Sequence, residues 1–312
     1  MMQIGEALSL TEGQSPRRMS WRNPARSILK IVSTIWTENT GIDRCVFLLH
    51  GFIWQLRKRL GHSLVTTLAN GAKLKVYPNT AFSAAFYTRW LERKDLLFIR
   101  AHADLAPTFV DVGANVGVFS ASLFDKFSYF ILIEPARACV TTLQETFALN
   151  PSVQGDIINV AVSNRSGVAS FLDEGDFSTT SRIVDGSKAA DSLEVTSVVV
   201  ETLDWILRAH QEDFIVKVDV EGHEQQVFDG AQQLLGTGRI KLLMFERLGR
   251  TNLDNILTFF DAMNYVVFFI LEDGTVTFDA EALRAPLINL FACPHSVVPR
   301  LAKRADAAQP SS

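Results

Sequence analysis

The sequence predicts an α/β fold in which a mostly parallel sheet is covered by helices on both faces. Short, almost wholly apolar stretches alternate with helical stretches between residues 108 and 246. Such apolar stretches are typical of parallel strands, because helices bury both faces of the sheet. The chain has 312 residues, of which 47% are hydrophobic. This content can bury a substantial core and excludes a wholly disordered chain.

Five apolar stretches are separated by enough chain for the crossover helices that parallel strands need. We expect strands at Thr108–Val112, Tyr129–Ile133, Asp156–Val160, Phe214–Val220 and Ile240–Phe245. Helices are expected from about Gly117 to Lys126, from Glu134-Pro135 to Leu149, and up to about Leu235. Proline suits the first turn of a helix, where the missing amide donor costs nothing.

Residues 1–62 are expected to form a leader and a helical extension, with the polar leader over residues 1–27. The apolar stretch Cys45–Leu56 has twelve residues, whereas a helix that spans a bilayer needs about 20. We therefore expect no transmembrane segment. Because basic residues flank this stretch, residues 44–59 fit two alternatives: a helix packed on the main domain, or an interfacial helix in peripheral contact with a membrane.

Residues 63–298 are expected to form the main domain, and the polar residues 299–312 a flexible tail. The domain opens with a hairpin around Asn70-Gly71, the strongest short hairpin signal, and a helical stretch follows at 82–103. Near its end, Tyr265–Leu271 is joined through Glu272-Asp273-Gly274 to strands that reach Ala292. Strands joined so closely must pair antiparallel.

A long excursion, Ser163–Thr196, interrupts the alternation of strands and helices. It contains three glycines and the small polar run Ser178–Ser181. Long loops of this kind are commonly lids or substrate loops. A plain surface insertion is the equally weighted alternative.

The net charge and the cysteines of the sequence give expectations about binding partners and about the cellular compartment. Thirty basic and 34 acidic residues give a net charge of −4, so we expect no nucleic-acid partner. Three widely spaced cysteines, Cys45, Cys139 and Cys293, argue against a disulfide framework or a structural zinc site. Together with the absence of a secretory signal pattern, they favour the reducing cytoplasm. The oligomeric state cannot be predicted from these features.

A candidate cofactor site follows the first strand, in the loop Asp111-Val-Gly113-Ala114-Asn115-Val-Gly117. Ligands of open α/β sheets bind beyond the carboxyl ends of the strands. Gly113 and Gly117 permit sharp turns and a close approach of the ligand, and Asn115 tolerates the left-handed region. Glu134, twenty-three residues after Asp111, ends the second strand, where a carboxylate can accept hydrogen bonds from ribose hydroxyls.

This loop lacks the third glycine of the dinucleotide pattern Gly-x-Gly-x-x-Gly, so a pyrophosphate fits it poorly. A nucleoside without phosphates, such as S-adenosyl-L-methionine, fits better.

The fourth strand ends in a dense group of ionisable residues, Lys217-Val-Asp219-Val-Glu221-Gly222-His223-Glu224. Residues two apart on a strand face the same way, so Asp219 and Glu221 converge if the strand persists. So many ionisable groups at the end of a buried strand are costly unless they are paired or functional. The alternative interpretation is a helix N-terminus whose acidic residues complement the helix dipole. It would explain Glu221 and Glu224, but it would not explain Asp219 or Lys217 inside a strand.

The motifs DVGANVG, IEP, AVSNRSG, KVDVEGHE and FER occur in this order and resemble the FkbM family of methyltransferases. The resemblance covers about Leu64–Pro294, some three quarters of the chain. It implies a class I methyltransferase (Rossmann-like) fold, with a seven-stranded sheet whose last strand is inserted antiparallel. It also implies that S-adenosyl-L-methionine is the cofactor and that a hydroxyl group, often on a sugar, polysaccharide or secondary metabolite, is the acceptor.

The resemblance also implies roles for individual residues. The loop from Asp111 to Gly117 would line the cofactor, and Glu134 would hold its ribose. Asp219 would lie near its methionine end, and Ala161 and Val162 would border its adenine. An alcohol is a weak nucleophile, and a general base typically contributes 10²–10⁴-fold. We expect His223 to be this base, oriented by Asp219 or Glu221, with Glu246 facing the acceptor.

Two alternatives remain open from the sequence: a nicotinamide-dependent oxidoreductase and a non-catalytic nucleoside-binding protein. A divalent metal on Asp219, Glu221 and His223 would be chemically compatible, but nothing in the sequence requires it, and we expect none.

Overall fold

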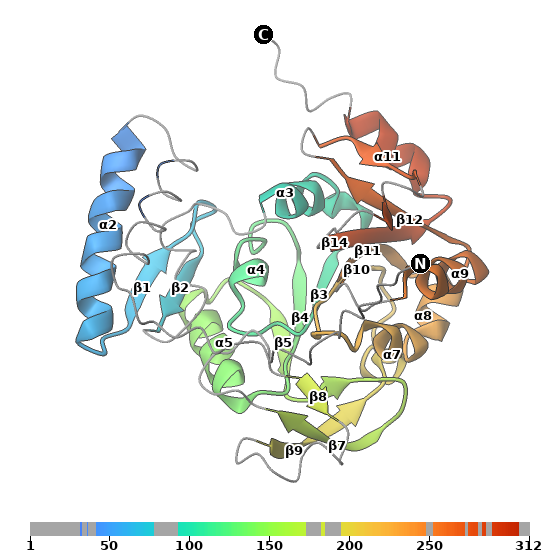
Figure 1. Ribbon diagram of the computed structural model, residues 1–312, viewed down its shortest axis with the longest axis horizontal. Helices are drawn as coiled ribbons and strands as arrows, with labels where there is room; N and C mark the ends of the chain where they lie inside the picture. The colour runs from blue at the N-terminus through green and yellow to red at the C-terminus, as the bar shows by residue number, and fades with distance from the viewer. Residues whose placement is uncertain are drawn as a thin grey trace, which may run out of the picture.

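The computed structural model describes residues 32, 36, 42–77, 93–172, 182–184, 195–247, 252–271, 274–279, 283–284 and 289–305. An eight-stranded sheet with the order β13-β12-β14-β11-β10-β3-β4-β5 forms its centre (Figure 1). The strands are β3 (Thr108–Val112), β4 (Tyr129–Ile133), β5 (Gly155–Ile158), β10 (Phe214–Val218), β11 (Ile240–Glu246), β12 (Tyr265–Ile270), β13 (Val276–Thr277) and β14 (Asn289–Pro294).

The sheet has the topology that the sequence led us to expect. β5, β4, β3, β10 and β11 pair in parallel. The last strand, β14, lies between β11 and β12 and runs antiparallel to both. Seven strands of this arrangement are those of the predicted class I fold. The short edge strand β13 makes the eighth, and its antiparallel pairing with β12 confirms the prediction for strands joined so closely.

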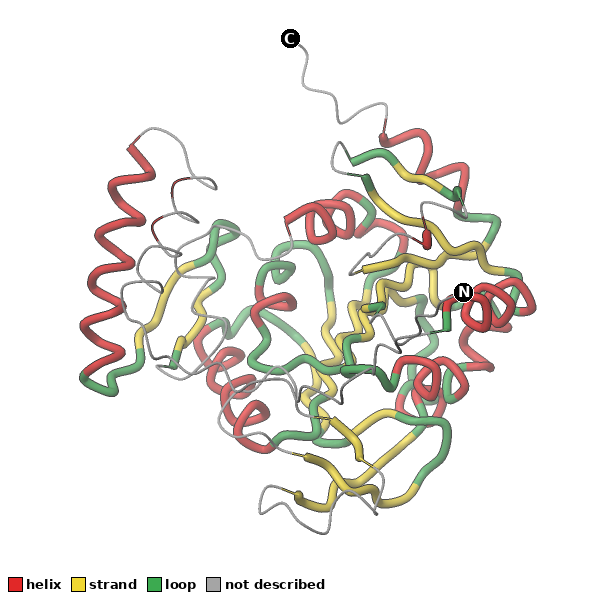
Figure 2. Tube along the Cα trace, viewed as in Figure 1, coloured by secondary structure: helices red, strands yellow, loops and turns green. Residues whose placement is uncertain are grey.

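Helices cover both faces of this sheet, as the tube in Figure 2 shows. They are α3 (Arg93–Ala101), η2 (Ala103–Leu105), α4 (Val118–Ala121), α5 (Arg137–Leu149), α6 (Leu203–Ile206), α7 (Glu224–Asp229), α8 (Gln232–Gly236), α9 (Leu253–Ala262) and α11 (Val298–Ala305). Alternate residues of β3 enter two separate cores. Val110 and Val112 pack with α6 to α9, whereas Phe109 packs with α3, α5 and α11. Burial on both sides explains why these strands are continuously apolar.

Several predicted boundaries were wrong. The helix after the glycine loop, α4, ends at Ala121 rather than near Lys126, and turns follow it. α5 begins at Arg137, so Pro135 lies before the helix rather than in its first turn. Helix α11 occupies residues 298–305, where a flexible tail was expected, because Leu301 is buried in the core beneath the sheet.

The excursion after β5 forms a second, four-stranded sheet with the order β6-β9-β7-β8. Its strands are β6 (Ala161–Val162), β7 (Gly167–Leu172), β8 (Arg182–Val184) and β9 (Val195–Glu201). The run Ser178–Ser181 lies outside the described residues. The part of the excursion that the structure describes is therefore paired in a sheet, and both predicted roles, a lid or substrate loop and a plain surface insertion, stay predictions.

The N-terminal extension packs on one side of the domain, in blue at the left of Figure 1. The predicted hairpin is confirmed: β1 (Leu64–Thr67) and β2 (Lys73–Val76) pair antiparallel. Helix α2 (Ile42–Arg59) buries Trp54 completely in a cluster with the hairpin and with residues of the glycine loop, α4 and α5. Among the described helices, none is long and apolar enough to cross a membrane.

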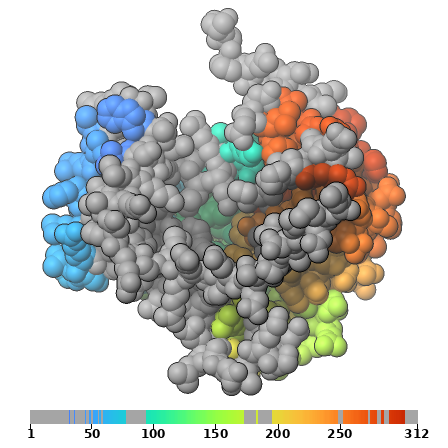
Figure 3. Space-filling view, viewed as in Figure 1, coloured from blue at the N-terminus to red at the C-terminus, as the bar shows by residue number. Residues whose placement is uncertain are grey.

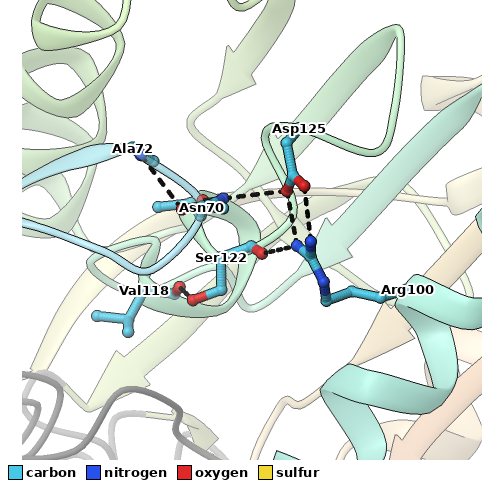
Figure 4. A network of polar contacts seen from close by, with 7 residues as sticks. Asn70, Ala72, Arg100, Val118, Ser122 and Asp125 are labelled. Atoms are coloured by element: carbon cyan, nitrogen blue, oxygen red, sulfur yellow. Dashed lines mark hydrogen bonds and ion pairs between the residues drawn. The ribbon is translucent and has the colours of Figure 1, made fainter.

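A polar network fixes the hairpin turn to the main domain (Figure 4). The Asn70 side chain donates to the Ala121 carbonyl at 2.8 Å and to Asp125 at 3.2 Å. Asp125 also receives two bonds of 2.6 Å from the Arg100 guanidinium. The paired bonds from Arg100 fix the position of Asp125, and Asp125 and the Ala121 carbonyl in turn hold the Asn70 side chain, so the hairpin turn has a defined place on the domain.

Candidate active site

The loop after β3 has the conformation that its glycines predict. Gly113, Asn115 and Gly117 have φ values of +79°, +49° and +78°. The amides of Gly113 and Ala114 both donate to the carbonyl of Ile133 at the end of β4. The loop is therefore fixed to the neighbouring strand, and the predicted left-handed position of Asn115 is confirmed.

Gly113 is also required by a close approach of two backbones. A Cβ at this position would lie 1.9 Å from the carbonyl oxygen of Asp219, which follows β10. At Gly117 a Cβ would lie 2.5 Å from Leu143 Cδ2 on α5. Side chains at either position would push the loop away from β10 or from α5.

Glu134 lies where a ribose-binding carboxylate is expected, just beyond β4. Its Oε2 accepts the amide of Asn115 at 2.8 Å and its Oε1 accepts the amide of Ala136 at 2.9 Å. Burial raises the pKa of Glu134 to about 7, although the two amides oppose the shift. Each carboxylate oxygen can accept more than one hydrogen bond, so both keep capacity for the hydroxyls of a ribose. The loop and Glu134 therefore fit the nucleoside that the sequence predicts.

A buried ion network joins the ends of β3 and β10. The Asp111 side chain is fully buried and accepts a bond of 2.6 Å from Ser120 Oγ. Lys217 Nζ lies 3.3 Å from Asp111 and 3.1 Å from Asp219. Asp111 was predicted to contact the cofactor, but its side chain has no exposed surface. It instead binds Ser120 and Lys217 in the interior, below the glycine loop. Buried charges need such partners.

Beyond β10 the chain turns, and three carboxylates come together. Asp219, Glu221 and Glu246 each place an oxygen within 4.8 Å of the others. The predicted convergence of Asp219 and Glu221 is thus confirmed, but its predicted cause is wrong. The strand ends at Val218, and Glu221 takes a left-handed φ of +54°. A non-glycine residue in this region is strained, which is common at functional sites.

Glu246, the last residue of β11, has the most perturbed environment in this carboxylate cluster. Burial and the negative charges of Asp219, Glu221 and Glu224 raise its pKa to about 8. Its Oε2 is buried and has no hydrogen-bond partner among the described residues. Three carboxylate oxygens suit a divalent cation, but protonation of Glu246 relieves the same repulsion, so the cluster does not require a metal.

His223, the predicted base, lies at the N-terminus of α7. Its Nε2 is 2.9 Å from Ser163 Oγ, which follows β6. The structure therefore brings together Asp219, Glu221 and Glu246. His223 is instead bound by Ser163, which follows strand β6 of the second sheet. The pair Ala161 and Val162 forms β6, three residues beyond the end of β5, and both residues are buried.

No role in the site was predicted from the sequence for four residues that shape it: Lys217 and Glu224, which were noted among the ionisable residues, and Ser120 and Ser163, which were not noted as candidates. Lys217 carried a signal, because a lysine in a wholly buried strand needs a buried partner. Glu224 is buried and accepts the amide of Gly222, which fixes the turn after the cluster. The two serines act through contacts that no local pattern shows.

Comparison with known proteins identifies one family. The Methyltransferase FkbM domain matches residues 111–267, about half of the chain. No curated protein matches the sequence significantly.

Several solved structures resemble parts of the chain. The putative methyltransferase yhhF from Escherichia coli is 15% identical, with a TM-score of 0.36, over 72% of this chain and 93% of that one. A TehB-like SAM-dependent methyltransferase from Corynebacterium glutamicum is 11% identical, with a TM-score of 0.38, over 68% and 91%. The T. thermophilus 16S rRNA N2 G1207 methyltransferase RsmC is 13% identical, with a TM-score of 0.36, over 75% and 50%. Because these scores are low, the fold assignment rests on the strand order above.

The raised pKa of Glu246 predicts a pH-dependent effect of the substitution Glu246→Gln. The folded state keeps the Glu246 proton up to about pH 8, whereas the ordinary value is 4.5. The folded state binds more protons between these values, so the contribution of Glu246 to stability falls as the pH rises through them. Glutamine stays neutral. The Tm of Glu246→Gln relative to the wild type should therefore be higher at pH 9 than at pH 5.

Thermal unfolding at both pH values measures this difference. Asp261→Asn, at an exposed position of α9, controls for the loss of one negative charge. A Tm difference for Glu246→Gln that does not change between pH 5 and pH 9 would contradict the perturbed environment of Glu246.

Proposed function

Because the chain belongs to the Methyltransferase FkbM domain family, we propose that it methylates a hydroxyl group of a sugar, a polysaccharide or a secondary metabolite. S-adenosyl-L-methionine is the methyl donor. The observation that carries the proposal is the placement of two groups of residues at one edge of the sheet. The glycine loop and Glu134 lie at the ends of β3 and β4, and the carboxylate cluster lies at the ends of β10 and β11.

The first group provides a subsite for the donor. Glu134 holds the ribose hydroxyls, and the backbone of Gly113, Ala114 and Asn115 forms the wall against which the nucleoside lies. When bound, the donor supplies an electrophilic methyl group on a positively charged sulfur. Asp219 is placed to face that charge, because its backbone lies directly against Gly113.

The second group provides the chemistry at the acceptor. The protein must align the hydroxyl oxygen within about 3 Å of the methyl carbon and remove its proton. In its ionised form Glu246 is suited to accept this proton, since a carboxylate with a pKa of about 8 is a stronger base than an ordinary one. His223 remains the alternative base, with its imidazole oriented by Ser163.

The match to a methyltransferase family gives no support to the alternative function, a nicotinamide-dependent oxidoreductase. The absent third glycine argues against the dinucleotide independently. A non-catalytic nucleoside-binding protein would keep the donor subsite but would not need a strained turn that gathers three carboxylates. We place the enzyme in the cytoplasm, in agreement with the wide spacing of its three cysteines along the sequence.

Glu134→Ala should weaken the binding of S-adenosylhomocysteine by at least about tenfold, because two ribose hydrogen bonds to a charged group are lost. Isothermal titration calorimetry measures the dissociation constant. Glu201→Ala, a carboxylate on β9 in the second sheet, is the control and should bind like the wild type. An unchanged constant for Glu134→Ala would remove Glu134 from the donor subsite.

His223→Ala and Glu246→Gln should separate the two candidate bases. Loss of the base should lower kcat by about 10²-fold or more while the affinity for S-adenosylhomocysteine stays within a fewfold of the wild type. The assay measures methyl transfer from labelled S-adenosylmethionine to a panel of sugars, polysaccharides and hydroxylated metabolites, with RNA as a further acceptor. If neither variant lowers turnover, general-base catalysis by this site is wrong. Transfer to RNA alone would overturn the proposed acceptor class.

A further inference from the structure

Helix α2 presents an apolar face to solvent. Leu49, Phe52 and Leu56 of α2, and Leu60 in the turn that follows it, are 58%, 71%, 53% and 61% exposed, and Ile53 between them is also exposed. Their spacing of three and four residues places them on one side of the helix. None of the described parts of the chain covers this face. Contiguous exposed apolar patches on otherwise polar proteins mark sites of interaction.

The opposite side of α2 is already occupied. Trp54 is fully buried in the cluster with the hairpin of β1 and β2, and Gly51, on the same side of the helix, is buried as well. Both alternatives that the sequence left open for this segment are therefore compatible with one structure: the helix packs on the domain through one side and leaves a second apolar side exposed. In Figures 1 and 3 the helix lies at the outer edge of the molecule.

The charges beside this face are positive. Arg57 and Arg59 are exposed, and by helical register they fall on the two borders of the apolar face. The sequence of α2 contains four basic residues and a single acidic one, Asp43. Residues 1–62 carry an excess of five positive charges, whereas the remaining 250 residues carry an excess of nine negative charges. The excess of positive charge therefore belongs to the N-terminal part of the sequence, which includes α2.

These features fit an anionic lipid surface better than a second copy of the chain. Two copies that met through this face would bring their arginines together with few acids to neutralise them. In a bilayer the apolar side chains enter the acyl boundary, while the arginines extend to lipid phosphates. The helix does not meet the requirements for crossing the bilayer, so it would lie in the interface.

We propose that α2 docks the protein on an anionic membrane surface, with Leu49, Phe52, Ile53, Leu56 and Leu60 inserted and Arg57 and Arg59 on lipid phosphates. The Trp54 cluster and the contacts of Asn70 with Asp125 and Ala121 hold the main domain in a fixed relation to that surface. The cluster includes Val116 of the glycine loop, so the docked helix is joined by direct packing to the donor subsite.

Vesicle flotation of the full chain tests this proposal. One set of vesicles contains phosphatidylcholine alone, and the other contains about one third phosphatidylglycerol. The wild type should float with the anionic vesicles. Phe52→Ser/Leu56→Ser should bind them at least about tenfold more weakly through loss of inserted apolar area, and Arg57→Gln/Arg59→Gln should bind about tenfold more weakly through loss of charge.

Val168→Ser is the matched control, because Val168 is 73% exposed on β7, outside the proposed surface. It should bind vesicles like the wild type, and all variants should bind S-adenosylhomocysteine equally. The proposal is overturned if the wild type does not float, or if Phe52→Ser/Leu56→Ser floats as well as Val168→Ser. It is also overturned if light scattering shows a dimer that this double variant dissociates while flotation is absent, since the face would then belong to a second copy.

Discussion

The close approach of the loop after β3 to the end of β10 is the constraint on which the rest of the site depends. Only glycine fits at position 113, because the carbonyl of Asp219 occupies the space that a Cβ would need. Beneath this contact Lys217 lies between Asp111 and Asp219, so that the buried charges of two neighbouring strands compensate one another. The donor loop and the acidic turn are consequently parts of one unit, and a change in one displaces the other.

The donor subsite and the carboxylate cluster of this unit differ in the groups that surround their carboxylates. In the donor subsite, Glu134 is satisfied by two backbone amides. In the carboxylate cluster, Glu246 lies among like charges that keep its proton bound to a higher pH. A group that is costly to ionise accepts a proton readily, so the repulsion that raises the pKa of Glu246 is also what suits it to act as a base. The strained φ of Glu221 is the structural cost of gathering these charges.

Local sequence was sufficient for much of this structure. Strands β3 and β4 were predicted to the residue because both faces are buried, and the glycines of the loop indicated where φ is positive. The fate of Asp111 could not be predicted, since its partner Lys217 is 106 residues away. The early end of β10 also escaped prediction, because the turn at Glu221 is stabilised by the contact of Glu224 with Gly222 and not by turn-forming residues alone. What the sequence did not show are contacts between strands that are distant along the chain.

The most direct test is a calorimetric titration of the wild type, Gly113→Ala and Gly236→Ala with S-adenosylhomocysteine, with NADH as the comparison ligand. A Cβ at Gly236 meets no atom within 4 Å, so this variant controls for adding a methyl group. The account predicts that the wild type and Gly236→Ala bind S-adenosylhomocysteine and not NADH, and that Gly113→Ala loses the binding. Binding of NADH alone by the wild type would contradict the donor assignment. A folded Gly113→Ala that binds as tightly as the wild type would contradict the role of the close approach.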